Sequence, residues 1–210
     1  DSFVSRGLGD VYKRQTGYFE TYNRENVKLV DISKQPIQRL VTDGIIVDDQ
    51  LYPFDSIIFA TGFDAMTGSI FNVDIKGRGG LALKEKWNAG PKTYLGLMSA
   101  SFPNLFMITG PGSPSVKSNM IMSIEQHVDL VIETLLSMRR KGLSVVEPEL
   151  EAENKWVDHV QEVANKTLFP QANSWYMGAN IPGKPRLFMP YIGGVGAYRE
   201  ICEEIVANNY

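Results

Sequence analysis

The chain has 210 residues, a formal net charge of −3 at pH 7 and 43% hydrophobic residues. This composition supports one or two packed cores, and its slightly acidic balance gives no reason to expect nucleic acid or a membrane surface as a partner. No apolar run approaches the roughly 18 residues that would span a bilayer. One cysteine excludes an internal disulfide, and with two distant histidines it forms no metal cluster. We expect a soluble α/β protein of the cytoplasm.

Short β-type runs fill the first quarter of the chain, at residues 27–32, 37–41, 45–47 and 51–54. Asp43-Gly44 separates the second run from the third, and Asp-Gly between apolar segments is a strong hairpin signal. The pattern predicts a small antiparallel meander that leads into the next strand. Residues 1–15 show no period and match no element.

A continuous apolar run at residues 57–60 is typical of a strand buried on both faces. Thr61 and Gly62 follow it directly. A small hydroxyl residue and a glycine allow close approach at the carboxyl edge of a sheet, which is where open α/β sheets bind ligands. The stretch is therefore either a core strand entering a tight turn or the edge of a cofactor site.

Residues 64–90 are glycine-rich and irregular, which indicates a connection with a small hairpin near residues 75–83. Trp87 within it is either a core or interdomain anchor, which we favour, or a residue that lines a site. Two further strand-like runs follow at residues 94–99 and 105–109.

The strongest helix signal begins near residue 120 and ends at Gly142, after a basic Arg139-Arg140-Lys141 turn. Ser118 or Asn119 can cap its start. The first turn contains no acidic residue, so the helix start is either a capped surface terminus or a site for an anionic group. Apolar residues recur at helical spacing, namely Met120, Ile121, Ile124, Val128, Val131, Ile132 and Leu135.

Residues 149–168 form a second amphipathic pattern, and residues 197–208 a closing helix with Ile201 and Ile205 inward. The buried face of the first should include Trp156, Val160, Val163 and Leu168.

Between these helices, residues 171–186 form a loop broken by glycine and proline, and residues 187–192 read as a strand. Trp175 in the loop offers a flat ring and one N–H donor, which suits either core packing or a cofactor. Lys184 and Arg186 are either a solvated pair, which we favour, or a phosphate site.

Three motifs together resemble Baeyer–Villiger flavin monooxygenases: Ala60-Thr-Gly-Phe-Asp-Ala65, Trp87-Asn-Ala-Gly-Pro91 and Ser174-Trp175. The resemblance runs from about Thr16 to Tyr210. It implies an α/β fold, as the carboxyl-terminal part of a flavoprotein with two dinucleotide-binding domains. The implied parts are residues 16–64 as the tail of the NADPH domain, 65–90 as the interdomain connection, and 91–210 as the end of the FAD domain with a control loop near 171–186.

The resemblance also implies FAD and NADPH as cofactors, a ketone and O₂ as substrates, and an ester or lactone as product. It assigns no catalytic residue here, because Lys13-Arg14 lies about three residues too close to Tyr18 to match the family's arginine. Lys117 departs from the apolar residue expected beside a ketone. The implied contacts are Thr61 and Gly62 at the domain junction, Asn119 and Met120 at the flavin, Trp175 at NADPH, and Ser115, Val116 and Lys117 at the substrate pocket.

No Gly-x-Gly-x-x-Gly fingerprint occurs, although this family should carry one for FAD and one for NADPH. We therefore interpret the chain as a fragment that does not retain FAD by itself. Two alternatives stay open. One is a related flavin monooxygenase that oxidises nitrogen or sulfur, against which the Trp87 and Ser174-Trp175 motifs argue. The other is a non-catalytic remnant that binds only a partner chain or a nucleotide.

Overall fold

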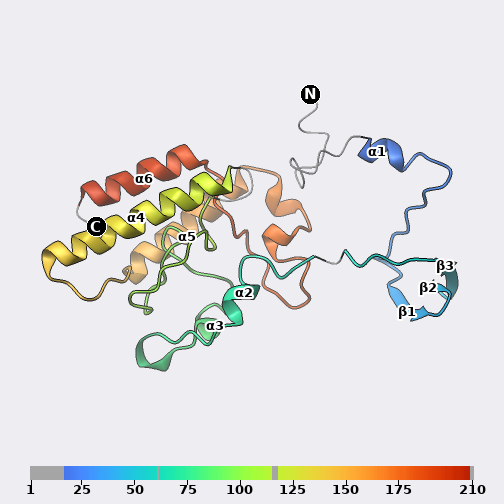
Figure 1. Cartoon of the computed structure of the whole chain (residues 1–210), viewed down its shortest axis with the longest axis horizontal. Coiled ribbons are helices and arrows are strands. Elements are labelled where there is room, and N and C mark those ends of the chain that lie inside the picture. Colours follow the sequence, from blue (N-terminus) through green and yellow to red (C-terminus); the bar gives the residue numbers. More distant parts are fainter. Residues whose placement is uncertain (1–16, 61, 115–117, 209–210) are drawn as a thin grey trace. The chain divides into compact units, whose positions relative to one another are not determined.

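The structure is a computed structural model that describes residues 17–60, 62–114 and 118–208 (Figure 1). The predicted contacts Thr61, Ser115, Val116 and Lys117 lie outside these ranges. The chain divides into two compact units, residues 1–62 and residues 63–210.

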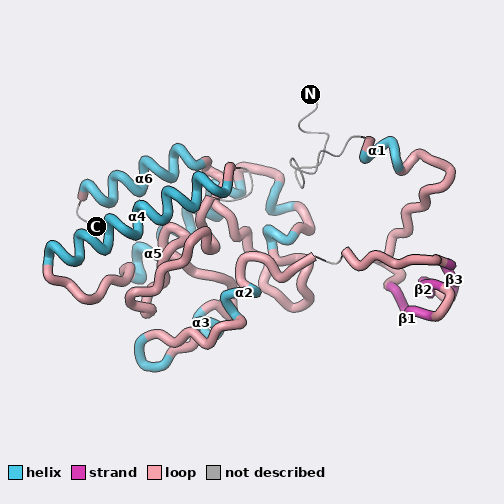
Figure 2. Tube along the Cα trace, in the orientation of Figure 1, coloured by secondary structure: helices cyan, strands magenta, loops and turns pink. Residues whose placement is uncertain are grey.

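The first unit contains helix α1 (Tyr18–Thr21) and one antiparallel sheet in the order β1 (Ile37–Val41), β2 (Gly44–Val47) and β3 (Gln50–Pro53) (Figure 2). The predicted meander is therefore confirmed. Val47 pairs with Gln50 across a two-residue turn in which Asp48 and Asp49 both have positive φ, 52° and 58°. Two consecutive central residues with positive φ are typical of a type I′ turn, whose twist matches that of the paired strands. Asp adopts positive φ more readily than most residues do. Residues 27–32, in contrast, form no strand.

The predicted buried strand at residues 57–60 is wrong for this structure. The run has no strand pairing, and Ile58 is 90% exposed and Phe59 68% exposed. Such a strand needs hydrogen-bonded neighbours and a layer over each face. The described part of the chain supplies neither for these residues, so the apolar run lies open.

The second unit begins with short helices α2 (Gly68–Phe71), η1 (Arg78–Gly80) and α3 (Leu83–Lys86). An antiparallel bridge between Lys76 and Ala82 confirms the small hairpin. Trp87 is 2% exposed within a cluster that includes Leu83 and Phe102, and its Nε1 donates to the Lys92 carbonyl at 2.9 Å. This confirms the anchoring interpretation of Trp87 over the site-lining one.

Three predicted strands in this unit, at residues 94–99, 105–109 and 187–192, do not form. Isolated bridges mark the first and the last, between Tyr94 and Met98 and between Pro114 and Tyr191, and no bridge is found at residues 105–109. Leu95 and Gly96 both adopt positive φ, which folds the first run back into a tight turn. Leucine, methionine and aromatic side chains of these runs, such as Leu97, Met107 and Phe188, are buried in the core without a sheet ladder.

Three long helices complete the second unit: α4 (Met120–Lys141), α5 (Leu150–Asn165) and α6 (Val195–Ala207) (Figure 1). Their shared core includes Trp156, Val160, Tyr198 and Cys202, with Val163, Ile201 and Ile205 partly buried against it. Leu168 was expected on the buried face of α5 but is 77% exposed, because the helix ends three residues earlier. The 171–186 loop is confirmed, with single turns η2 (Phe169–Gln171) and η3 (Trp175–Met177) at its start.

Helix α4 places its polar residues inside and much of its apolar face outside. Ile121 is 63% exposed, Ile132 49% and Leu135 47%. The helix positions that the second unit buries are instead Ser123, Gln126, His127, Thr134 and Ser137. Surface helices of globular proteins usually bury their apolar stripe. The exposed apolar face of α4 is therefore a surface that a further layer of protein would cover.

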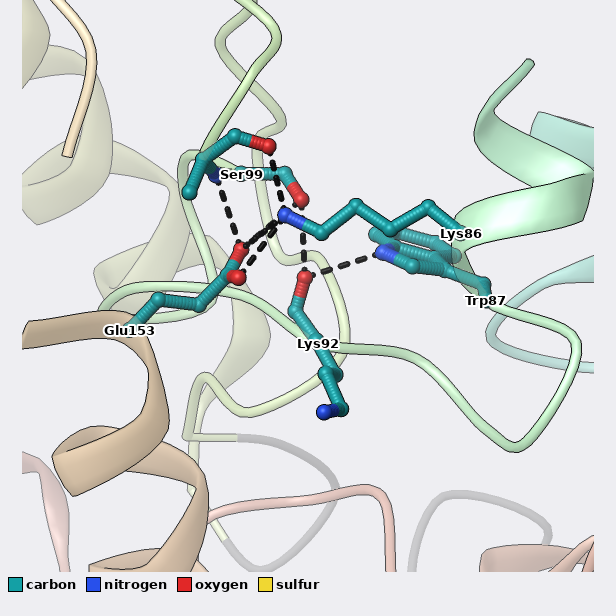
Figure 3. A network of polar contacts seen from close by, with 6 residues as sticks. Lys86, Trp87, Lys92, Ser99 and Glu153 are labelled. Atoms are coloured by element: carbon teal, nitrogen blue, oxygen red, sulfur yellow. Dashed lines mark hydrogen bonds and ion pairs between the residues drawn. The ribbon is translucent and has the colours of Figure 1, made fainter. Parts of the chain in front are cut away.

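A buried ion pair ties α3 to α5 (Figure 3). The Glu153 carboxylate is fully buried and lies 2.7 Å from the Lys86 ammonium. It also accepts hydrogen bonds from the Ala100 backbone N–H at 2.8 Å and from the Ser99 hydroxyl at 2.9 Å. Buried carboxylates are retained only when paired and hydrogen-bonded in this way.

Candidate cofactor site

The start of α4 is capped as the sequence predicted. The Asn119 side chain accepts a hydrogen bond from the Ile121 N–H at 3.0 Å, so Asn119 rather than Ser118 is the cap. The helix ends at Gly142, which has a φ of 67°. No acidic side chain stands in the first turn, whereas the last turn carries three basic residues. The positive end of the helix dipole is therefore free of a local carboxylate, and that donor set fits an anionic group.

Gly112 and Ser113, which precede α4 in the chain, are held by several contacts. Gly112 has a φ of +87°, and a Cβ there would come within 2.8 Å of the Thr93 hydroxyl oxygen. Its N–H donates to the Met189 carbonyl at 2.6 Å, and its own carbonyl accepts from the Trp156 indole at 3.0 Å. Tyr191 extends the attachment by donating its N–H to the Ser113 carbonyl at 2.9 Å. Residues far apart in sequence thus hold Gly112 and Ser113 in place.

His127 on α4 is a residue that the sequence reasoning did not single out. Its side chain is fully buried, and its Nδ1 accepts the Thr109 backbone N–H at 3.1 Å. Thr109 has a φ of 56°, so this bond stabilises a strained backbone position directly before Gly110. Burial lowers the pKa of His127 to about 4, which keeps the ring neutral with its proton on Nε2. The sequence feature that could have pointed to His127 is its position among the regularly spaced apolar residues of this helix.

Trp175 lies in the η3 turn, partly buried, with its ring 4.1 Å from the Tyr176 ring at an interplanar angle of 32°. Tyr176 in turn packs on Phe169 and Phe188. The indole is thus backed by an aromatic cluster and presents a supported flat surface, which is a geometry suited to stacking.

The sequence suggested a solvated pair at Lys184 and Arg186; Arg186 is exposed as expected, whereas Lys184 is not. The Lys184 side chain is only 12% exposed and pairs with Asp64. Arg186 bonds the Asn173 side chain within its own loop. Lys184 is therefore engaged by a carboxylate, and the phosphate alternative has no support at this residue.

The remaining predicted contacts are split between the two units. Gly62 belongs to the first unit, with a φ of +78° and open space where a Cβ would stand. Asn119, Met120 and Trp175 belong to the second. Among the described residues, no group of three His, Cys, Asp or Glu side chains could hold a metal ion. None of the described helices is both long and apolar enough to cross a membrane.

Comparison with known proteins identifies relatives over nearly the whole chain. A Baeyer–Villiger monooxygenase of Pseudooceanicola batsensis is 41% identical over 206 residues, which cover 96% of this chain and 37% of that protein. A phenazine N-monooxygenase of Lysobacter antibioticus is 38% identical, over 96% of this chain and 38% of that protein. No protein-family model matches the chain.

Solved structures give the same result. A steroid monooxygenase bound to NADP is 48% identical with a TM-score of 0.79, over 93% of this chain and 37% of that one. The protein OTEMO in complex with FAD and NADP is 39% identical with a TM-score of 0.82, over 93% of this chain and 36% of that one. The chain thus spans little more than a third of the relatives that it matches. Over nearly all of its own length, it is a homologue of that third of the Baeyer–Villiger flavin monooxygenases.

Proposed function

We propose that this chain is the carboxyl-terminal part of an FAD-containing, NADPH-dependent Baeyer–Villiger monooxygenase. The reaction would take a ketone, O₂, NADPH and a proton to an ester or lactone, water and NADP⁺. The observation that carries the proposal is the 41% identity to such an enzyme over 96% of the chain. The flavin would supply the oxygen chemistry when bound, and the protein would bind, orient and shield it.

The geometry of α4 supports a flavin contact at Asn119 and Met120. The helix start has its Asn119 cap and no acid in the first turn, so its backbone N–H groups suit an anionic ring edge. Gly112, which precedes this helix in the chain, is itself held by hydrogen bonds to Met189 and Trp156. Ser115, Val116 and Lys117 come between that loop and the helix, and we assign them to the wall of the ketone pocket.

Trp175 is the proposed NADPH contact. Its ring is held against Tyr176, which leaves it preorganised for stacking on a ring or a ribose. Thr61 and Gly62 are proposed at the junction between the NADPH part, residues 16–64, and the connection at residues 65–90. Residues 91–210 would then close the FAD part.

Helix α4, which exposes apolar side chains and buries polar ones, supports the proposal that this chain is part of a longer protein. Its exposed apolar stripe, which includes Ile132 and Leu135, needs a covering layer. The match covers 37% of the Pseudooceanicola relative, so most of that protein's length is not matched by this chain. We assign the covering layer to that unmatched part. The exposed run at residues 57–60 needs sheet neighbours for the same reason.

A second candidate reaction is oxygen transfer to nitrogen, because one 38% identical relative is a phenazine N-monooxygenase. The two candidates share the cofactors and differ in the acceptor.

A chimaera separates them. In it, this chain replaces the matched part of the Pseudooceanicola enzyme, and the purified protein receives NADPH with either cyclohexanone or phenazine. We expect caprolactone from the ketone and no phenazine N-oxide. N-oxide without lactone would establish the second candidate, and a chimaera that binds flavin but oxygenates neither would contradict both.

A further inference from the structure

The Lys184 side chain joins two segments that lie 120 residues apart. Its ammonium pairs with the Asp64 carboxylate and donates to the Ala65 carbonyl at 3.3 Å. The side chain is only 12% exposed, whereas exposed lysine pairs on α5 such as Lys166–Glu162 leave the lysine 69% exposed. The Asp64 carboxylate is 38% exposed, so the pair is shielded from water at its lysine end only. Because the ammonium is shielded and also donates to a backbone carbonyl, the contact constrains the lysine more than a fully exposed surface pair does.

The absence of a side chain at Gly178 leaves room for the aliphatic part of Lys184. This glycine ends the η3 turn with a φ of 68°, and a Cβ on it would lie 3.1 Å from Lys184 Cδ and 3.1 Å from the Pro185 carbonyl oxygen. The aliphatic stem therefore crosses directly over the residue that closes the Trp175 turn. The same crossing directs the ammonium at Asp64.

A second contact runs parallel to the first. The Asn180 side-chain amide donates to the Phe63 carbonyl at 3.1 Å. Asp64 is itself anchored, because its carbonyl accepts the Gly68 N–H at 3.1 Å at the start of α2. Three contacts thus attach the loop of residues 171–186 to residues 63–65, immediately after the Gly62 position.

We propose that Lys184 is a positioning residue for Trp175. Its pair with Asp64 holds the Trp175 turn in one place and couples that turn to the segment at the proposed domain junction. The nucleotide consequence rests on the proposed function, in which Trp175 contacts NADPH. Nucleotide binding to a turn that is already ordered loses less conformational entropy. Loss of the Lys184–Asp64 pair should therefore weaken nucleotide affinity and leave flavin binding unchanged.

Hydrogen exchange on this chain tests the attachment without any cofactor. We expect Lys184→Met to speed amide exchange in residues 174–179 and 64–68 by roughly tenfold, since a hydrogen-bonded charge is lost from both. Asp64→Asn should do the same, and the double variant should be no faster than either single one. Lys184→Arg should retain most of the protection. Lys166→Met, which removes an exposed, ion-paired lysine directly after α5, is the matched control. Exchange at the wild-type rate in Lys184→Met would overturn the proposal.

The chimaera then tests the nucleotide consequence. Lys184→Met should weaken NADP⁺ binding several-fold at unchanged flavin content, whereas Lys166→Met should change neither. Unchanged NADP⁺ affinity in Lys184→Met would overturn the positioning role. A chimaera that binds no flavin or NADP⁺ at all would contradict the proposed function, while the exchange result would still decide the Lys184–Asp64 attachment.

Discussion

The Lys86 ammonium lies 2.7 Å from the Glu153 carboxylate, and the carboxylate is completely buried between α3 and α5 (Figure 3). Among the described residues, the carboxylate contacts Lys86, the Ser99 hydroxyl and the Ala100 N–H. Of these groups, Lys86 is the one that carries a positive charge. The pair therefore fixes the irregular 64–90 segment to the helical core through one charge contact.

Lys86→Met should destabilise the chain by about 3–5 kcal/mol, because it leaves Glu153 charged and unpaired in the interior. Lys86→Met with Glu153→Gln should recover part of that loss. Urea unfolding measures both. Lys166→Met, which removes an exposed ion pair, should unfold at the same urea concentration as the wild type. If Lys86→Met also did so, the buried Glu153 carboxylate would not need Lys86 for the stability of the fold.

His127 should make stability fall with acid in a defined window. Its pKa is about 4 in the folded chain and 6.5 as an ordinary histidine, so the unfolded state takes up the proton first. The stabilisation is complete above pH 6.5 and is lost as the pH falls towards 4; at about 1.4 kcal/mol per pKa unit it amounts to ~3 kcal/mol.

His127→Gln removes this titration. Urea midpoints should fall less steeply between pH 6.5 and 4 in the variant than in the wild type, after allowing for the carboxylates common to both. Parallel curves would show that burial does not lower the pKa of His127.

The apolar face of α4 should make this chain self-associate or bind hydrophobic dyes. Ile132→Gln with Leu135→Gln should reduce both, as measured by light scattering and dye fluorescence, because these side chains are about half exposed. Glu133→Gln on the same helix is the matched control.

In the chimaera, the same double change should lower the melting temperature, since the face is then covered. A double variant as stable there as the parent chimaera would mean that no layer covers α4.

Trp175→Ala should weaken NADPH binding to the chimaera about three- to tenfold, the value of a lost aromatic stack. Trp175→Phe should retain most of the affinity. Rapid-mixing measurement of flavin reduction against NADPH concentration gives both values, and equal affinity in all three proteins would remove Trp175 from the site.

Local signals in the sequence predicted much of the fold. The Asp-Gly hairpin, the Asn119 cap and the Gly142 terminus are each decided by a few neighbouring residues, and each formed as predicted. Strand predictions at residues 57–60, 94–99 and 187–192 did not, because a strand depends on distant neighbours that no local pattern reports. For the same reason the sequence did not reveal which face of α4 is covered, or that Lys184 reaches Asp64.

Labelled oxygen distinguishes the proposed monooxygenase from other sources of product oxygen, because a monooxygenase inserts one atom of O₂ into its substrate. The chimaera is purified, its absorbance near the flavin bands is recorded, and it is supplied with NADPH, cyclohexanone and ¹⁸O₂. We expect a yellow protein and a lactone that carries one ¹⁸O atom. A correctly folded chimaera that holds no flavin, or lactone without the label, would contradict it.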